Sequence, residues 1–184
     1  TSGDAHIRPQ RSDELAAVVA VVDEAYGRPI VAELVTQLQE RHEGPASVSL
    51  VAELHGEIVG HVQLSRCWVD APDRLVEVLS LSPLSVLPRH QGHGIGGRLV
   101  REALQAARQG RWPLVFLEGS RDYYSRFGFE AAHRRGFIRP SPRIPEVAFQ
   151  VAMLPDWEPW MTGGFVYTDV FWELDCVGLR TSRS

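Results

Sequence analysis

A cluster of glycines in the middle of the chain has the composition of a phosphate-binding loop. The segment from Gln91 to Gly97 contains the pattern G-x-G-x-x-G and leads directly into a predicted helix. Glycines let a ligand approach the backbone closely, and the N–H groups and dipole at a helix start attract anions. We therefore predict that a pyrophosphate binds the backbone of Gln91, Gly92, His93, Gly94, Ile95, Gly96 and Gly97.

Two other interpretations of these glycines stay open. A strand, the glycine pattern, a helix and a strand that ends in Glu118 together match a dinucleotide-binding unit in outline. Against it, residues 88–91 separate the strand from the first glycines of the pattern, and the preceding strands look like hairpins, which a parallel sheet would not use. The third interpretation is a tight turn that only packs a helix on a sheet, for which four glycines in six residues are excessive.

The elements on either side of the glycines would hold the loop in place. On the C-terminal side, apolar residues recur at helical spacing, with Gly110 where a C-terminal cap belongs: Ile95, Leu99, Val100, Ala103, Leu104 and Ala107. On the N-terminal side, Arg74 to Val86 reads as a strand that contains Pro83. Because proline has no N–H to donate, we expect sheet pairing to fail locally at that residue.

The rest of the chain predicts a mixed α/β (α+β) fold. Ser12 is a predicted N-cap for a first helix that Gly27 ends, and a second helix runs from Ile30 to Glu40 before Gly44-Pro45. Predicted strands cover residues 7–9, 47–54, 58–69, 114–117, 148–154 and 165–170, and residues 122–127 form a short helix. We expect one domain over residues 1–184, with a mixed, mostly antiparallel central sheet flanked by helices.

Composition excludes several classes of function. The 184 residues are 44% hydrophobic and carry a net charge of −4 without a basic run, which argues against a nucleic-acid partner. No apolar stretch has the length of a membrane helix, so we expect no membrane partner. Cys67 and Cys176 are far apart and have no metal-ligand spacing, so we expect reduced thiols, no metal site and a cytoplasmic protein.

Two motifs resemble those of the GCN5-related N-acetyltransferase (GNAT) family. Gln91 to Gly96 matches its Q/R-x-x-G-x-G/A loop, with Pro88 ahead of it, and Tyr124 to Glu130 matches its Y-x-x-x-G-F-E. The resemblance covers about residues 5–155, leaving residues 156–184 as a C-terminal extension, and is greatest to YhbS-like bacterial members. It implies the acyl-CoA N-acyltransferase fold.

The same resemblance implies acetyl-CoA as co-substrate. Its pyrophosphate would lie on the glycine loop, and its pantetheine arm would pair with backbone at Leu84, Ser85 and Val86 where two strands separate. An amide N–H near Val86 would stabilise the oxyanion. Tyr124 matches the tyrosine that protonates the departing CoA thiolate, although it could instead only pack against pantetheine.

The resemblance implies transfer of an acetyl group to a primary amine of a small molecule or peptide. No motif identifies the general base, for which Glu77, Glu118 and His133 are candidates. Open alternatives are a longer acyl chain, a non-catalytic acyl-CoA-binding module and, less favoured, a dinucleotide-binding protein. The tryptophan-rich segment from Pro155 onward is expected to close the acceptor site or a homodimer interface.

Overall fold

The computed structural model describes residues 4–41 and 47–180, which form two compact units. The first unit combines the described residues up to Ser65 with Leu81–Ala107, and the second combines Arg66–Ser80 with the described residues from Arg108 onward. Two long strands, Glu57–Asp70 and Leu75–Val86, therefore contribute residues to both units. The predicted helix end at Gly44-Pro45 lies outside the described residues.

Helices and strands follow one another in mixed order along the chain. The strands are β1 His6–Pro9, β2 Ser47–Leu54, β3 Glu57–Asp70, β4 Leu75–Val86, β5 Leu114–Glu118, β6 Glu130–Ala131, β7 Phe149–Met153 and β8 Gly164–Val166. The α-helices are α1 Leu15–Tyr26, α2 Pro29–Arg41, α3 Ile95–Gln109, α4 Arg121–Tyr124 and α5 Asp169–Glu173, and the 3₁₀ turns are η1 Pro88–His90, η2 Ser125–Phe127 and η3 Ala132–Arg135.

The strands form one mixed sheet, which confirms the predicted fold class. Seven strands follow the order β1-β2-β3-β4-β5-β7-β6, and β8 pairs with β3 off this path. The pairs β1–β2, β2–β3, β3–β8, β5–β7 and β6–β7 are antiparallel, whereas β4–β5 is parallel. Hairpin pairing ahead of the glycine loop counts against the doubly wound parallel sheet that a dinucleotide-binding fold requires.

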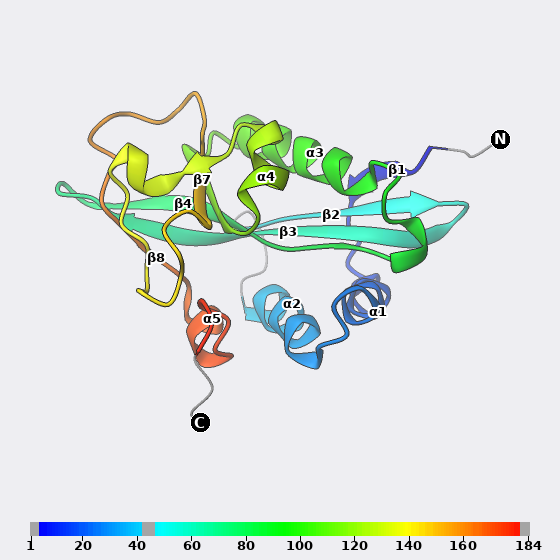
Figure 1. Ribbon diagram of the computed structural model, residues 1–184. Helices are drawn as coiled ribbons and strands as arrows, with labels where there is room; N and C mark the ends of the chain where they lie inside the picture. Colours follow the sequence, from blue (N-terminus) through cyan, green and yellow to red (C-terminus); the bar gives the residue numbers. More distant parts are fainter. Residues whose placement is uncertain (1–3, 42–46, 181–184) are drawn as a thin grey trace. The chain divides into compact units, whose positions relative to one another are not determined.

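Helices cover both faces of the strands in the first unit. Figure 1 shows α1 and α2 on one face of β2 and β3 and α3 on the other. Val18 and Val35 of the two N-terminal helices pack in a buried cluster with Val51 of β2. On the α3 side, a Cβ atom at Gly60 would lie 3.0 Å from Leu99 Cδ1, so this glycine lets α3 approach the sheet closely. The apolar face predicted for α3 is buried throughout.

One of the two predicted helix caps was wrong. The cap residue of α1 is Glu14 rather than Ser12, because the Glu14 carboxylate binds Arg8 and accepts the Arg11 backbone N–H at 2.7 Å, which holds the preceding turn outside the helix. Helix α3 ends at Gln109, so Gly110 follows it directly as predicted, and the next residue, Arg111, is left-handed with φ 62°. The Arg111 N–H donates to the carbonyl of Arg108 at 3.0 Å and closes that turn.

The second unit builds its core from residues on both sides of Pro155. Phe165 of β8 lies with its ring centroid 4.7 Å from that of Phe116 and 5.3 Å from that of Phe149. The strand predicted over residues 165–170 ends at Val166, and the short helix α5 follows it with Val170 and Phe171 buried. The segment predicted as an extension therefore supplies a strand, a helix and core aromatic rings.

Candidate active site

The glycine loop has the open backbone that a pyrophosphate site needs. Gly92 and Gly94 have φ angles of 77° and 83°, in the left-handed region that favours glycine. A Cβ atom at either position would meet no heavy atom within 4 Å, so the space above the backbone is open. Helix α3 begins at Ile95, and its first-turn N–H groups have no partner within the helix. The loop therefore presents donors and a helix dipole to an anion.

Gln91 joins this loop to the end of β4. Its side-chain Nε2 donates to the carbonyl oxygen of Val86 at 2.9 Å, and its backbone N–H donates to Pro88 at 3.3 Å. His93 Nδ1 lies 3.4 Å from the carbonyl oxygen of His90, a second contact inside the loop. The glutamine of the motif thus links the loop to the end of β4 across the short turn η1.

The end of β4 has an outer edge that does not pair with β3. The Leu87 N–H donates to the carbonyl of Val59 on β3 at 2.8 Å. Backbone groups of successive residues in a strand point to opposite sides, so those of Leu84 and Val86 point away from β3. Both carbonyls accept side-chain donors instead, Leu84 from the Tyr26 hydroxyl at 2.9 Å and Val86 from Gln91. This edge is the stretch predicted to pair with pantetheine, and the Ser85 side chain between the two is buried.

In the second unit, Glu118 is a half-buried carboxylate with two donors. The Tyr167 hydroxyl donates to Glu118 Oε1 at 2.8 Å, and the Gly178 N–H donates to Oε2 at 3.3 Å. Burial raises the pKa of Glu118 above its usual range, although both hydrogen bonds oppose that shift. The pKa of Tyr167 is raised too, mainly by burial, so its hydroxyl remains a donor. Sequence reasoning missed both partners because they lie 49 and 60 residues away.

The Tyr124 ring packs on the backbone that follows Glu118. A Cβ atom at Gly119 would lie 2.7 Å from Tyr124 Cε2, so only glycine leaves room for the ring. Ser120 caps the short helix α4 that carries the ring, and the Phe129 ring packs edge-on at 5.8 Å. The Tyr124 ring therefore lies against Gly119, the residue that directly follows Glu118.

Two other predicted site residues lie elsewhere. Glu77 is exposed and pairs with Arg66 at 3.3 Å. Parallel pairing of Leu79 with Val115 puts Glu77 five residues before Glu118 along the strand direction, a separation of roughly 16 Å. His133 is exposed in η3. Both residues are thus exposed, and the strand register keeps Glu77 away from the Glu118 carboxylate. Sheet pairing was expected to fail near Pro83, and the pairs between β4 and β5, at Leu79 and Ser80, both come before that proline in the sequence.

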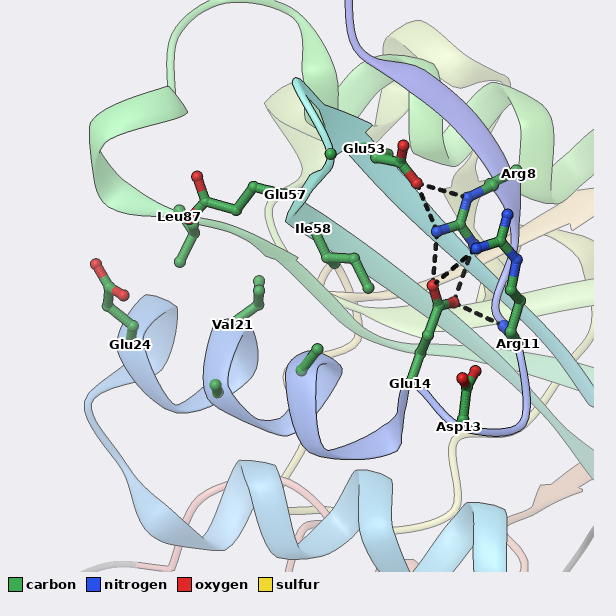
Figure 2. A pocket seen from close by; sticks show the side chains of 13 residues that line it. Arg8, Arg11, Asp13, Glu14, Val21, Glu24, Glu53, Glu57, Ile58 and Leu87 are labelled. Atoms are coloured by element: carbon green, nitrogen blue, oxygen red, sulfur yellow. Dashed lines mark hydrogen bonds and ion pairs between the residues drawn. The ribbon is translucent and has the colours of Figure 1, made fainter.

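A separate cleft of about 590 Å³ lies in the first unit among β1, α1 and the β2–β3 turn. Figure 2 shows Arg8 between Glu14 and Glu53, with both ion pairs at 2.6 Å. Hydrogen bonding to Arg8 lowers the pKa of Glu14 to about 2. No residue predicted to bind the co-substrate lines this cleft. Four of its acidic side chains form ion pairs, Glu14 and Glu53 with Arg8, and Glu24 and Glu57 with Arg89.

Metal-binding groups, membrane-spanning helices and disulfides are all absent from residues 4–41 and 47–180. That part of the chain contains no group of three or more His, Cys, Asp or Glu residues that could hold a metal ion. None of its helices is both long enough and apolar enough to cross a membrane. Both cysteines are free thiols, as predicted, and burial raises the pKa of Cys67 to about 12.

In sequence, the chain is similar to known acetyltransferases. The sequence model of the acetyltransferase (GNAT) domain matches residues 6–132. YjhQ, an uncharacterized N-acetyltransferase of Escherichia coli K12, is 38% identical over 127 residues, which cover 66% of this chain and 67% of YjhQ. YhbS, another uncharacterized N-acetyltransferase of that strain, is 30% identical over 151 residues, which cover 82% of this chain and 87% of YhbS.

Solved structures show the same fold with the expected class of ligand. Escherichia coli YhbS in complex with CoA superposes with a TM-score of 0.82 at 29% identity, covering 91% of this chain and 92% of YhbS. A GNAT family acetyltransferase from Brucella melitensis in complex with acetyl-CoA has a TM-score of 0.72 at 31% identity, covering 91% and 97% of the two chains. The chain described here belongs to the GCN5-related N-acetyltransferase family.

Proposed function

We propose that this protein is an N-acetyltransferase that transfers the acetyl group of acetyl-CoA directly to a primary amine of a small molecule or peptide. The observation that carries the proposal is the open glycine loop at the start of α3, in a chain whose solved relatives hold CoA or acetyl-CoA. The sequence-based expectation of a cytoplasmic enzyme is part of the same proposal.

The residues of the first unit fit the co-substrate. Gly92 and Gly94 leave space for a pyrophosphate to reach the backbone, and α3 adds the donors and dipole of its first turn. The outer edge of β4 offers Leu84 and Val86 to the amides of a pantetheine arm, as an open strand edge binds an added strand. When bound, acetyl-CoA supplies an acetyl thioester, and a backbone N–H near Val86 would polarise its carbonyl.

Tyr124 is the proposed general acid. Its hydroxyl would give a proton to the sulfur that departs from the acetyl group, and the lack of a side chain at Gly119 leaves room for the ring. A tyrosine hydroxyl titrates near ~10, so it is fully protonated at neutral pH and can donate.

Glu118 is the proposed general base, directly or through water, with Glu77 as the alternative. The amine must lose a proton to attack, and a carboxylate whose pKa is raised towards neutrality accepts protons more readily. Burial raises the pKa of Glu118 in this way. A carboxylate has about four lone-pair sites, so the two donors on Glu118 leave acceptor capacity.

The test is incubation of the protein with acetyl-CoA and a panel of small amines and peptides, with release of free thiol as the readout. Thiol release that depends on the amine supports the proposal. Binding of acetyl-CoA without turnover across a broad panel would instead favour a non-catalytic acyl-CoA-binding module. Stabilisation by NAD but not by acetyl-CoA in a thermal melt would return the dinucleotide interpretation.

A further inference from the structure

The hydroxyl of Tyr26 donates a hydrogen bond to a backbone carbonyl in the stretch proposed to hold the pantetheine arm. Tyr26 is the last residue of α1, and its hydroxyl donates to the Leu84 carbonyl at 2.9 Å across 58 residues of sequence. The next residue, Gly27, ends the helix with φ 63°, and its N–H donates to Asp23 at 2.8 Å. The contact joins the end of a helix to the outer edge of β4, within the first unit.

The Leu84 carbonyl needs a partner that the sheet does not supply. It points away from β3, and Leu84 is half-buried, so an unpaired carbonyl would be costly there. Val86, the other outward carbonyl, receives Gln91. Both acceptors on this edge are therefore satisfied by side chains. A side-chain donor can be exchanged for another donor without breaking a rung between two strands.

A pantetheine arm carries the donor that would make this exchange. It contains two secondary amides, each with one N–H and one carbonyl, which is the hydrogen-bonding chemistry of a peptide strand. One such N–H replaces the Tyr26 hydroxyl at Leu84 one for one. The hydroxyl can then bond to water, because 43% of the Tyr26 surface is already exposed.

We propose that Tyr26 is a placeholder for the pantetheine arm: its hydroxyl satisfies Leu84 in the free protein and gives up this carbonyl when acyl-CoA binds. The inference rests on the proposed function and adds a positioning residue to it. Loading of the co-substrate then releases the end of α1 from β4.

The test compares the parent with Tyr26→Phe, which keeps the ring of a partly exposed residue and should fold. Calorimetry measures binding of CoA and of adenosine 3′-phosphate 5′-diphosphate, the fragment of CoA that has the pyrophosphate but lacks pantetheine. The variant should bind CoA about two- to twelve-fold more tightly, because a hydrogen bond of ordinary net strength no longer competes. Its affinity for the fragment should be unchanged.

Thermal melts give a second readout. Without ligand the variant should melt below the parent, since Leu84 has lost its donor, and saturating CoA should remove most of that difference. Three results would overturn the placeholder role: equal or weaker CoA binding by the variant, an equal change in affinity for CoA and for the fragment, or identical melting of the two free proteins. A parent protein that binds no CoA at all would overturn the proposed function instead.

Discussion

A carboxylate placed on the glycine loop should abolish CoA binding while the fold survives. In Gly94→Asp the new side chain would meet no protein atom, because a Cβ atom there has no neighbour within 4 Å. The cost to folding is then the left-handed backbone alone, since φ is 83°; for a residue other than glycine this costs about 1–2 kcal/mol. For a chain of this length, that lowers the melting temperature by about 2–8 °C.

The loss of binding should be larger than this loss of stability. Each hydrogen bond from a backbone N–H to a charged phosphate contributes about 1.5–3 kcal/mol, so losing one weakens CoA binding about tenfold to more than a hundredfold. Repulsion between the carboxylate and the pyrophosphate adds to that loss.

A matched control is available in the same unit. Gly56→Asp adds the same side chain at φ 81°, again with no atom within 4 Å, but in the β2–β3 turn. Calorimetry with CoA and thermal melts of the free proteins provide the comparison. Gly94→Asp and Gly56→Asp should lose similar stability, and only the first should lose CoA. Parental CoA affinity in a folded Gly94→Asp protein, or equal loss in both variants, would refute the phosphate-binding loop.

Three further predictions concern the acid, the base and the acidic cleft. Tyr124→Phe should keep CoA affinity but lower kcat by roughly ten- to ten-thousand-fold, less so at high pH where the thiolate leaves unaided; parental kcat from neutral to alkaline pH would exclude Tyr124 as the acid. In the parent, kcat/KM should rise with pH as the general base loses its proton, and Glu118→Gln should remove that rise because the pKa of Glu118 is raised. If Glu77→Gln removes the rise and Glu118→Gln does not, the base is Glu77. Glu14 has a pKa of about 2 when folded, lowered by Arg8, so its stabilising contribution is present above the unfolded pKa and is lost as pH falls towards 2. The free energy of unfolding, measured by denaturation at several pH values, should therefore fall less for Glu14→Gln than for the parent between about pH 4 and pH 2. An equal fall in both proteins would contradict this.

Local patterns in the sequence predicted most of the fold correctly. The buried face of α3, the turn between β2 and β3 and the glycines of the loop depend on neighbours a few residues away, and the structure agrees with all of them. The cap of α1 was wrong because Arg8 draws the Glu14 carboxylate into an ion pair, which no propensity at Ser12 reveals. The end of β8 was misplaced because it depends on pairing with β3, which stops at Val166.

The contacts around the candidate site could not be predicted as well from the sequence. Its chemically important contacts join distant residues: Tyr26 to Leu84, and Tyr167 to Glu118. Motif spacing can name Tyr124 and the glycines, because each motif lies within one short segment. It cannot say which tyrosine meets a given carbonyl 58 residues away, since that depends on the packing of helices against the sheet.

The two donors on Glu118 have a consequence for how the protein is made. Tyr167 and Gly178 lie 49 and 60 residues after the carboxylate that they bind. During synthesis at about 5–20 residues per second, a nascent chain carries Glu118 for several seconds before either donor exists. Until then β5 cannot bury that carboxylate with its native partners. The second unit should therefore reach its native state late, and a ribosome stalled just before Tyr167 should expose a protease-sensitive second unit beside a first unit whose residues have all been made.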